Sequence, residues 1–391
     1  MPSSIRKSLD ELPITLDDTY ERILQGIPKE KSQHARRLFQ CIVAAFRPLR
    51  VEELAEIFAI EFGPNDVTNL VAGWRPENPE EAILSACSSL ITIIDDEGSK
   101  IVQFSHFSVK EYMTSDRLQT SNIGHVCDYY IPLGQAHTVL ARACIAILLQ
   151  LDEKVDRKRV ATFPLADYSS KRWLDHAKFE NVQSQIQDAL KNLFDPKRPH
   201  LRACIWVHNV AVEHSVSIGN HSAAEQPPPL PATPLFYAVF CGFSEVARWL
   251  ITTHAEDVNV KCYDGRTPLQ VASHEGHVDV VHVLLDHGAH VDLKNDIGWM
   301  PLHFASEGGN LEVVQLLLEH EATLDPRTGA GSSPLYLASR DGHLEVVRLL
   351  LSQGADVQLQ GQFGRTPFQI ATANSHHDVA QLLLEHGAKR G

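Results

Sequence analysis

In the C-terminal part of the chain, segments with apolar residues at helical spacing occur two by two. In the unit at 264–293, Val280, Val281, Leu284 and Leu285 follow at i, i+1, i+4 and i+5, which predicts one continuous apolar face on an α-helix. A shorter apolar pattern precedes it and ends at a glycine suited to a left-handed helix terminus. We therefore expect two short helices packed together, followed by a polar, turn-rich loop.

This two-helix unit recurs five times. The prolines that open the first helix, Pro234, Pro268, Pro301, Pro334 and Pro367, are separated by 34, 33, 33 and 33 residues. Proline suits the first helical position because no backbone donor is needed there, and the preceding Thr267 is placed to cap its helix. A fixed period of this size predicts a stacked solenoid in which each unit buries its apolar face against its neighbours. The five predicted units cover 231–260, 264–293, 297–326, 330–359 and 363–391.

The unit at 264–293 contains the segments Asp264-Gly265-Arg266-Thr267-Pro268-Leu269 and Gly276-His277-Val278-Asp279-Val280-Val281. These segments resemble the ankyrin repeat. The chain departs from the repeat pattern at Glu321-Ala322, which replaces Gly-Ala, and at Ser375, which replaces a glycine. The histidine that follows Pro-Leu in the pattern is present only as His303 and is absent from the other four units. The other units are therefore expected to have weaker loop hydrogen bonds. The resemblance implies an ankyrin-repeat α-solenoid with β-hairpin loops and a concave groove that binds a protein.

The front half of the chain predicts helices beside one β-hairpin. Helical patterns at 15–27, 38–46, 51–58 and 82–90 precede apolar strands at 91–94 and 101–104, which are joined by an acidic turn. Helices beside a single hairpin form a winged-helix plan. We expect a mostly α chain with a winged-helix domain at 9–118, a helical connector at 119–215 and the repeats at 231–391. The Pro-rich segment at 216–230 is interpreted as a stiff linker, with a docking motif for an aromatic-lined groove as the alternative.

A second set of motifs lies in this front half. The segments are Ser8-Leu9-Asp10-Glu11-Leu12-Pro13, Tyr20-Glu21-Arg22-Ile23-Leu24, Phe46-Arg47-Pro48-Leu49-Arg50-Val51-Glu52-Glu53-Leu54-Ala55, His106-Phe107-Ser108-Val109-Lys110-Glu111-Tyr112, Leu165-Ala166-Asp167-Tyr168 and Trp173-Leu174-Asp175-His176-Ala177. They look like segments of fungal NACHT–ankyrin proteins, which resemble animal and plant NOD-like receptors. The resemblance implies a nucleotide switch followed by a winged helix, a helical connector and repeats.

The switch itself has no counterpart in the sequence. No Gly-x-x-x-x-Gly-Lys-Ser/Thr loop occurs, and such a loop is the usual cradle for a triphosphate. We therefore expect no ATP hydrolysis, no catalytic residue and no cofactor, and interpret the chain as the tail of a longer receptor, a truncated relative or a naturally short adaptor. In the related receptors the histidine at the position of His106 contacts the β-phosphate of ADP. That contact is implied here only if another chain supplies a nucleotide domain; a histidine bonded to local backbone is the alternative.

Charge argues against nucleic acid as a direct partner. The formal net charge is −14, and the region from 231 onward contributes −9, with 10 Lys and Arg against 19 Asp and Glu. In the winged helix, Glu52, Glu53 and Glu56 are expected to have no basic counterweight, and the hairpin tip Asp95-Asp96-Glu97 is acidic. These carboxylates would repel phosphate. An acidic repeat surface permits a basic protein partner, and a solubilising face is the alternative.

Cysteine and histidine spacing predicts no metal site. The seven cysteines are scattered and odd in number, which fits a reducing compartment. His274-Glu275-Gly276-His277 is one residue short of the zinc-protease spacing, and its glycine falls where the helix should end, so we expect these histidines to pack the loops. No signal peptide or long apolar run occurs, which predicts a cytoplasmic or nuclear protein without a membrane partner.

A partner is expected in the groove formed by the loops and the exposed sides of the first helices. Aromatic residues and arginine are the usual interface anchors. The predicted partner-binding residues are Lys261, Tyr263, Lys294, Ile297, Trp299, Arg327, Tyr336, Arg340 and Phe363. For Trp299 the alternative is that it covers its neighbour's apolar edge. The preferred function is a non-enzymatic receptor tail or adaptor; the alternatives are a nuclear transcriptional co-regulator acting through protein contacts, and a fragment or partner subunit of a NACHT-type switch.

Overall fold

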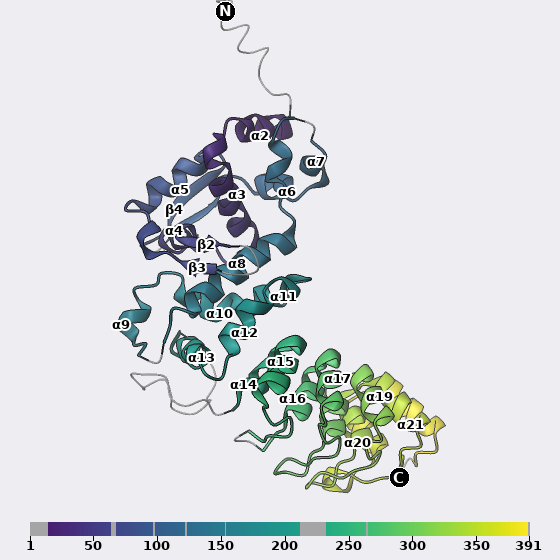
Figure 1. Cartoon of the computed structure of the whole chain (residues 1–391). Helices are drawn as coiled ribbons and strands as arrows, with labels where there is room; N and C mark the ends of the chain where they lie inside the picture. Colours follow the sequence, from purple (N-terminus) through teal and green to yellow (C-terminus); the bar gives the residue numbers. More distant parts are fainter. Residues whose placement is uncertain are drawn as a thin grey trace, which may run out of the picture. The chain divides into compact units, whose positions relative to one another are not determined.

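The computed structural model describes residues 15–63, 68–96, 98–121, 123–152, 154–211, 232–262 and 265–389. Over these residues the chain is mostly helical (Figure 1). Its internal contacts divide it into two units, one of residues 1–193 and 198–228 and the other of residues 194–197 and 229–391. The predicted linker at 216–230 lies outside the described residues.

The first unit begins with a winged helix. Its helices α2 (Leu16–Gln25), α3 (Lys29–Ala44), α4 (Val51–Phe58) and α5 (Pro79–Cys87) accompany an antiparallel sheet in the order β1-β5-β4, formed by β1 (Leu49–Arg50), β5 (Ser99–Phe104) and β4 (Ile91–Asp96). Strands β4 and β5 pair from Ile91 opposite Phe104 to Asp96 opposite Ser99. This is the helix and hairpin arrangement that the sequence predicts. The sequence did not predict β1, or the small sheet of β2 (Ile60–Phe62) and β3 (Thr68–Leu70), because strands of two or three residues leave no periodic pattern.

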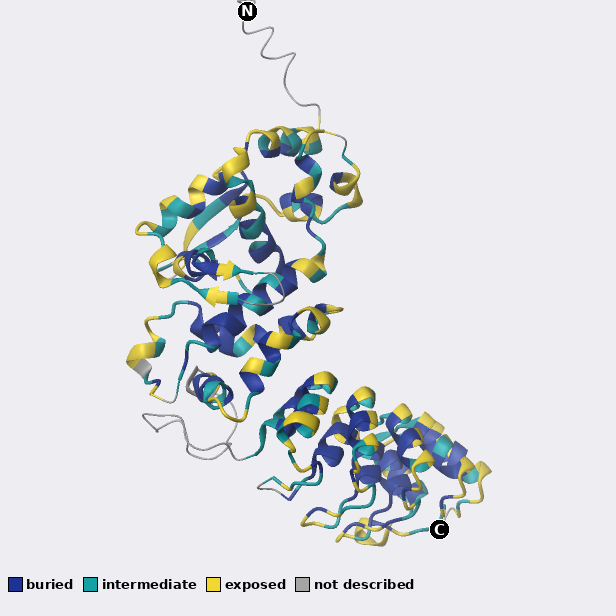
Figure 2. Cartoon of the chain, viewed as in Figure 1, coloured by how far each residue is buried: buried dark blue, intermediate teal, exposed yellow. Residues whose placement is uncertain are grey.

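Helix α8 (Leu133–Leu148) is the centre of the remainder of this unit. It packs against α3 and α10 (Ala166–Ala177) and is buried along most of its length (Figure 2). The other elements are η1 (Ala72–Trp74), α6 (Phe107–Met113), α7 (Asp116–Gln119), η2 (Val126–Tyr129), α9 (Arg157–Val160), α11 (Val182–Gln185), α12 (Gln187–Phe194) and α13 (His200–Ala211). No helix within the described ranges combines the length and apolar character needed to cross a bilayer.

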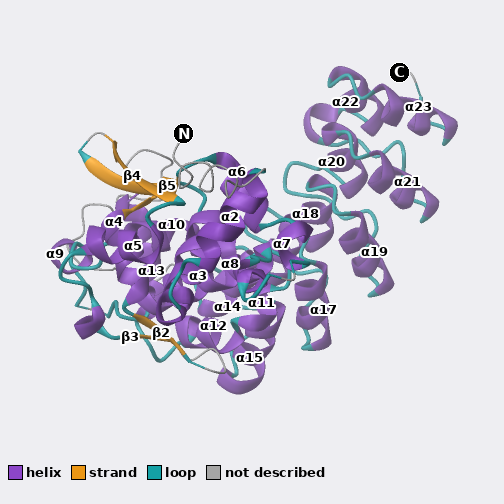
Figure 3. Cartoon of the chain, turned by 90° about the horizontal axis from the view of Figure 1, so that it is seen from above, coloured by secondary structure: helices purple, strands orange, loops and turns teal. Residues whose placement is uncertain are grey.

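The second unit stacks five helix pairs. The pairs are α14 (Pro234–Cys241) with α15 (Ser244–His254), α16 (Pro268–Glu275) with α17 (Val278–Asp286), α18 (Pro301–Glu307) with α19 (Leu311–Glu319), α20 (Pro334–Asp341) with α21 (Leu344–Ser352), and α22 (Pro367–Ala373) with α23 (His377–Glu385). Each first helix packs on the first helix of the next pair, and each second helix on the next second helix. The described strands all belong to the first unit, and the repeats consist of helices and loops (Figure 3). A helical solenoid is confirmed.

Local capping explains where the first helices begin and end. Thr267 Oγ1 accepts a hydrogen bond from Gln270 N at 3.3 Å, and Ser333 and Thr366 cap their helices in the same way. The left-handed turn after the first helix uses glycine in most repeats, whereas Ser375 adopts it at φ 65°. Glu321 does the same at φ 62° after a second helix. The two departures from glycine therefore keep the backbone of the repeat and leave a non-glycine residue in a strained conformation.

Glutamine replaces the loop histidine of the repeat without loss of its hydrogen bonds. His303 Nδ1 accepts from Met300 N at 3.0 Å, and its Nε2 donates toward Pro326 O and Ser332 O at 3.1 and 3.2 Å. In the preceding repeat Gln270 Oε1 accepts from Thr267 N at 3.0 Å, and its Nε2 donates to Leu293 O and Trp299 O at 2.7 and 3.1 Å. The expectation of weaker loop hydrogen bonds is therefore wrong for this repeat, because the amide has the same acceptor and donor arrangement.

Candidate binding surface on the repeats

The loops between repeats form a regular series of tight turns. Each turn is closed by one backbone hydrogen bond, which joins Cys262 N to Arg266 O, Asn295 N to Trp299 O, Thr328 N to Ser332 O and Gly361 N to Arg365 O at 2.8–3.0 Å. In each turn a glycine immediately precedes the residue whose carbonyl accepts this bond. These glycines, Gly265, Gly298, Gly331 and Gly364, have positive φ between 68° and 84°. The expected hairpin loops thus take the form of short turns. We call segments 261–266, 294–299, 327–332 and 360–365 the turn row.

Hydrogen bonds also join one turn to the next. Gly329 N donates to Ile297 O at 2.9 Å, which links the second turn to the third. Arg327 Nη2 donates to Gln360 O at 2.8 Å, which links the third turn to the fourth, while its Nε donates to Gly331 O at 3.1 Å. These three turns are therefore held in register by backbone acceptors. Arg327, predicted to contact a partner, uses its guanidinium to order the turns.

Two large apolar side chains lie exposed on this row. Ile297 is 63% exposed and Phe363 is 86% exposed. Phe363 also has a φ of 62°, a left-handed conformation that costs a non-glycine residue about 1–2 kcal/mol. An exposed aromatic ring on strained backbone adds nothing to the stability of the chain itself, so both side chains are candidates for contact with another molecule.

The predicted lysines lie beside these apolar residues. Lys261 and Lys294 are exposed, and Lys261 Nζ lies 3.8 Å from Asp296 Oδ1. Tyr263 lies outside the described residues. Sequence reasoning missed Arg365, which is exposed next to the fourth turn; its signal is its position two residues after the exposed aromatic.

Tyr336 is not a surface residue, which corrects the sequence expectation. Its side chain is 2% exposed, its Oη donates to Gln362 O at 3.4 Å, and a Cβ added at Gly361 would lie 2.5 Å from its ring. Trp299 packs against the buried cluster of Tyr336, Leu337 and Ile370 and is half-buried. The alternative interpretation of Trp299, as cover for a neighbouring apolar edge, matches this packing. Aromatic residues in these positions fill the space between repeats, which a pattern of residue types does not distinguish from an interface anchor.

Arg340 joins two repeats. Its Nη2 donates to Glu307 Oε1 at 2.8 Å and to Asp341 Oδ2 at 2.8 Å. The hydrogen bond with Asp341 and that with Glu307 together raise the pKa of Arg340 above its ordinary range, although burial acts in the opposite direction. Both of its ion pairs are internal, and the pair with Glu307 serves the contact between repeats.

The histidines that follow the first helices pack against the preceding repeat. His277 Nε2 lies 3.1 Å from Phe240 O, and His343 Nε2 lies 2.8 Å from Glu307 O. Asn310 occupies the same place in the third repeat and donates to Ser273 O and His274 O at 2.8 Å. The predicted role of His277 in loop packing agrees with its contact. Over the part of the chain that is described, no group of three or more His, Cys, Asp or Glu residues could hold a metal ion.

His106 is bonded locally. It is exposed at the N-terminus of α6, where Nδ1 accepts from Ser108 N at 3.3 Å and lies 2.5 Å from Ser108 Oγ. Ser108 Oγ in turn lies 2.7 Å from Tyr20 Oη. These contacts correspond to the alternative interpretation of His106, a histidine bonded to local backbone.

Two of the three glutamates of α4, Glu53 and Glu56, are buried and paired, which corrects the expectation that they lack a basic counterweight. Glu53 accepts two hydrogen bonds from Arg47, at 2.7 and 2.8 Å, and further bonds from Arg50 N and Arg50 Nη2. Burial acts to raise the pKa of Glu53, but the hydrogen bonds from Arg47 and Arg50 outweigh it and hold the pKa below its usual range. Glu56 accepts from Leu165 N at 2.7 Å and pairs with Arg75. The arginines lie outside the helix, so helical periodicity does not reveal them.

Further contacts bring three motifs of the front half together. Phe46 N donates to Tyr168 Oη at 3.3 Å, and Tyr168 Oη lies 2.9 Å from His176 Nε2. His176 Nδ1 lies 2.8 Å from His137 Nδ1 on α8. Burial, with smaller contributions from His137 and Arg172, lowers the pKa of His176 to about 3, so the imidazole is neutral. The motifs at 46–55, 165–168 and 173–177 thus meet where the winged helix contacts α10.

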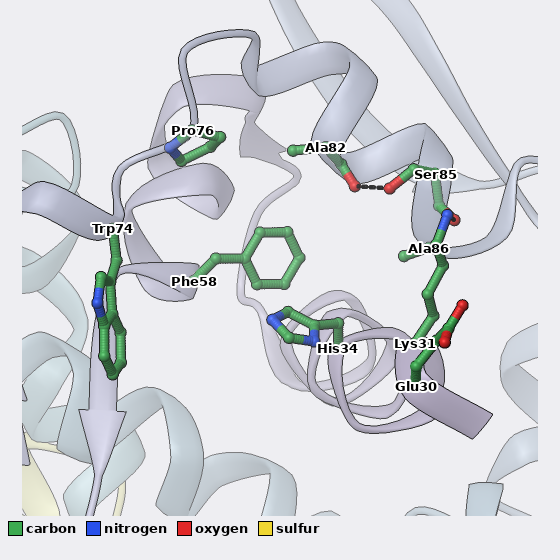
Figure 4. A pocket seen from close by; sticks show the side chains of 9 residues that line it. All are labelled: Glu30, Lys31, His34, Phe58, Trp74, Pro76, Ala82, Ser85 and Ala86. Carbon is green, nitrogen blue, oxygen red and sulfur yellow. Dashed lines mark hydrogen bonds between the residues drawn. The ribbon is translucent and has the colours of Figure 1, made fainter. Parts of the chain in front are cut away.

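A second concave feature lies on the winged helix. A cavity of about 400 Å³ opens between α3, α5 and the segment from α4 to η1. Phe58 lies between Trp74 and His34 in this cavity, and Trp74 is 56% exposed (Figure 4). The lining residues are Glu30, Lys31, His34, Phe58, Trp74, Pro76, Ala82, Ser85 and Ala86. Its size suits a small apolar ligand or an inserted side chain. No sequence pattern predicts this cavity, because its walls come from separate segments.

Comparison with known proteins defines the class of each unit. Residues 203–295 and 291–361 match the family described as ankyrin repeats (3 copies), and residues 363–390 match the ankyrin repeat. Residues 20–123 match the winged helix domain of GPI inositol-deacylase. The chain therefore combines a winged helix of the GPI inositol-deacylase type, which is NACHT-associated, with C-terminal ankyrin repeats, and both predicted resemblances are confirmed.

One relative extends over both units. It is the azaphilone pigments biosynthesis cluster protein L of Monascus ruber, a fungus, and it is 28% identical over 297 residues. The match covers 72% of this chain and 61% of the relative, so the chain spans less than two thirds of the relative's length.

Proposed function

We propose that the chain is a non-enzymatic adaptor or receptor tail whose ankyrin repeats hold a protein partner on the turn row and the adjoining faces of the first helices. Ankyrin repeats support a protein-interaction role. The turn row is proposed as the binding surface because Ile297 and Phe363 are exposed on turns that are hydrogen-bonded to one another. Apolar side chains on a rigid backbone lose little conformational entropy when a partner covers them.

The charges of the first unit bear on this proposal. The winged helix is joined to the start of α10 by the bond from Leu165 N to the buried Glu56, and to α10 itself by the bond from Phe46 N to the buried Tyr168. The exposed first turn of the helix before the hairpin bears Glu80 and Glu81, and the hairpin end bears Asp95 and Asp96. This charge disfavours DNA as the ligand of the winged helix. The partner is therefore assigned to the repeats.

Site-specific crosslinking tests the location. A photoreactive side chain placed at Ile297 in the full chain, irradiated in cells, should give a discrete adduct with another protein. The control position is Glu345 on α21, whose side chain is 62% exposed. An adduct from position 297 and none from position 345 is expected. The same adduct from both positions, or an adduct from position 345 alone, would contradict the proposal.

A further inference from the structure

Charge is divided between two faces of the ankyrin repeats. The turn row contains five Lys or Arg residues and two Asp residues, a net charge of +3. The second helices, α15, α17, α19, α21 and α23, contain eight Asp or Glu residues and two Arg residues, a net charge of −6. The acidic surplus of the repeats therefore lies largely on the second helices. The acidic surface expected of the repeats thus describes the second helices and not the turn row, because a sum over the sequence does not separate the two faces.

Two cations of the turn row lie close in the sequence to its exposed apolar residues. Lys294 precedes Ile297 by three residues, and Arg365 follows Phe363 by two. Both cations are exposed, and among the described residues neither forms an ion pair. On the first helices, by contrast, the cation Arg340 is already paired with Glu307 and Asp341. The available positive charge thus lies along the turns.

The row is ordered before any partner arrives. The bonds from Gly329 N to Ile297 O and from Arg327 Nη2 to Gln360 O connect three successive turns. Cationic and apolar groups alternate along this row. They are complementary to an extended peptide segment in which carboxylates and apolar side chains alternate. Complementary charge of this kind speeds encounter and selects among partners, while buried apolar side chains supply most of the affinity.

We propose that the turn row binds an acidic linear segment containing large apolar residues, with Lys294 and Arg365 facing its carboxylates and Ile297 and Phe363 facing its apolar side chains. This inference rests on the proposed function and adds the chemical class of the partner. A basic segment is disfavoured by the same cations.

A random peptide library displayed on phage provides the probe. Purified full chain is used to select peptides, and the affinity of the selected peptides is measured for three proteins. They are the unaltered chain, the double variant Lys294→Gln/Arg365→Gln, and the control Arg248→Gln/Arg348→Gln, which makes the same charge change on the second helices. Phe363→Asn removes the ring while keeping a residue that tolerates the left-handed conformation.

The selected peptides should be enriched in Asp and Glu and contain a large apolar residue. Their affinity should fall by about tenfold in the Lys294/Arg365 variant, since two charge contacts of modest strength are lost, and should be unchanged in the control. Phe363→Asn should also weaken binding, with thermal stability equal or higher. Enrichment of neutral or basic peptides, equal losses in both charge variants, or no enrichment would overturn the inference. Basic peptides that still depend on Phe363 would leave the proposed function standing.

Discussion

Two buried polar residues of the repeats share the same arrangement of hydrogen-bond donors and acceptors. His303 and Gln270 occupy equivalent places, and each accepts one backbone N–H and donates to two carbonyls. The two differ in their response to acid. Burial lowers the pKa of His303 to about 4, and protonation would place a second proton on Nδ1 facing the Met300 N–H. The neutral form is therefore the one that the repeat requires.

This difference predicts an acid-sensitive contribution to stability. Because the folded pKa of His303 is below its unfolded value, stability is complete above pH 6.5 and is lost as the pH falls toward 4. Between pH 7 and pH 5 the loss should be about 2 kcal/mol. His303→Gln should remove this component while keeping the hydrogen bonds. Urea unfolding at the two pH values measures it, and an identical pH dependence in both proteins would contradict the assignment.

At the scale of the element, glycine positions differ in what they do for the helix ends. Gly342 ends α20 at φ 81°, and a Cβ there would lie 2.5 Å from the ring of His376 in the next repeat. Gly354 follows α21 at φ 91° with no atom near the place of a Cβ. The first glycine thus serves both backbone conformation and contact between repeats, and the second serves conformation alone.

Alanine at the two positions should therefore have unequal effects. Gly354→Ala should destabilise the chain by about 1 kcal/mol through backbone strain. Gly342→Ala should cost about 1–3 kcal/mol more, because the imidazole of His376 must move as well. Thermal unfolding of both variants gives the comparison. Equal losses would show that the packing of His376 under Gly342 does not contribute.

The sequence predicted these elements well where they are periodic. The 33-residue spacing defined the helix pairs, the Thr267 cap and the turn glycines, because each depends on local residue type. It did not separate Tyr336, which is buried, from Phe363, which is exposed, since both are aromatic residues in the same kind of unit. It also could not foresee that Arg47 and Arg50 neutralise Glu53, because that pairing depends on how α4 meets the segment before it.

At the scale of the whole molecule, the first unit depends on buried charge to join its winged helix to the following helices. Glu53 is fully buried, while its partners Arg47 and Arg50 remain partly exposed. Loss of one partner in such a group leaves polar atoms without bonds in a buried place. The contact of Arg47 with Asp167, at 3.9 Å, extends the group to α10.

Glu53→Gln should therefore destabilise the first unit by about 2 kcal/mol, since the amide cannot hold both arginines as the carboxylate does. Glu52→Gln, on the exposed side of the same helix, is the matched control and should change stability little. Chemical unfolding followed by tryptophan fluorescence measures both. A loss in the control as large as that in Glu53→Gln would contradict the role assigned to the buried group.

The turn row of the ankyrin repeats is the surface that we propose holds a protein partner. Hydrogen–deuterium exchange of the full chain, alone and with a protein that co-purifies with it, tests this most directly. We expect partner-dependent protection at 294–299, 327–332 and 360–365 and on the adjoining first helices. Protection confined to α15, α17, α19, α21 and α23, or to the winged helix, would contradict the claim.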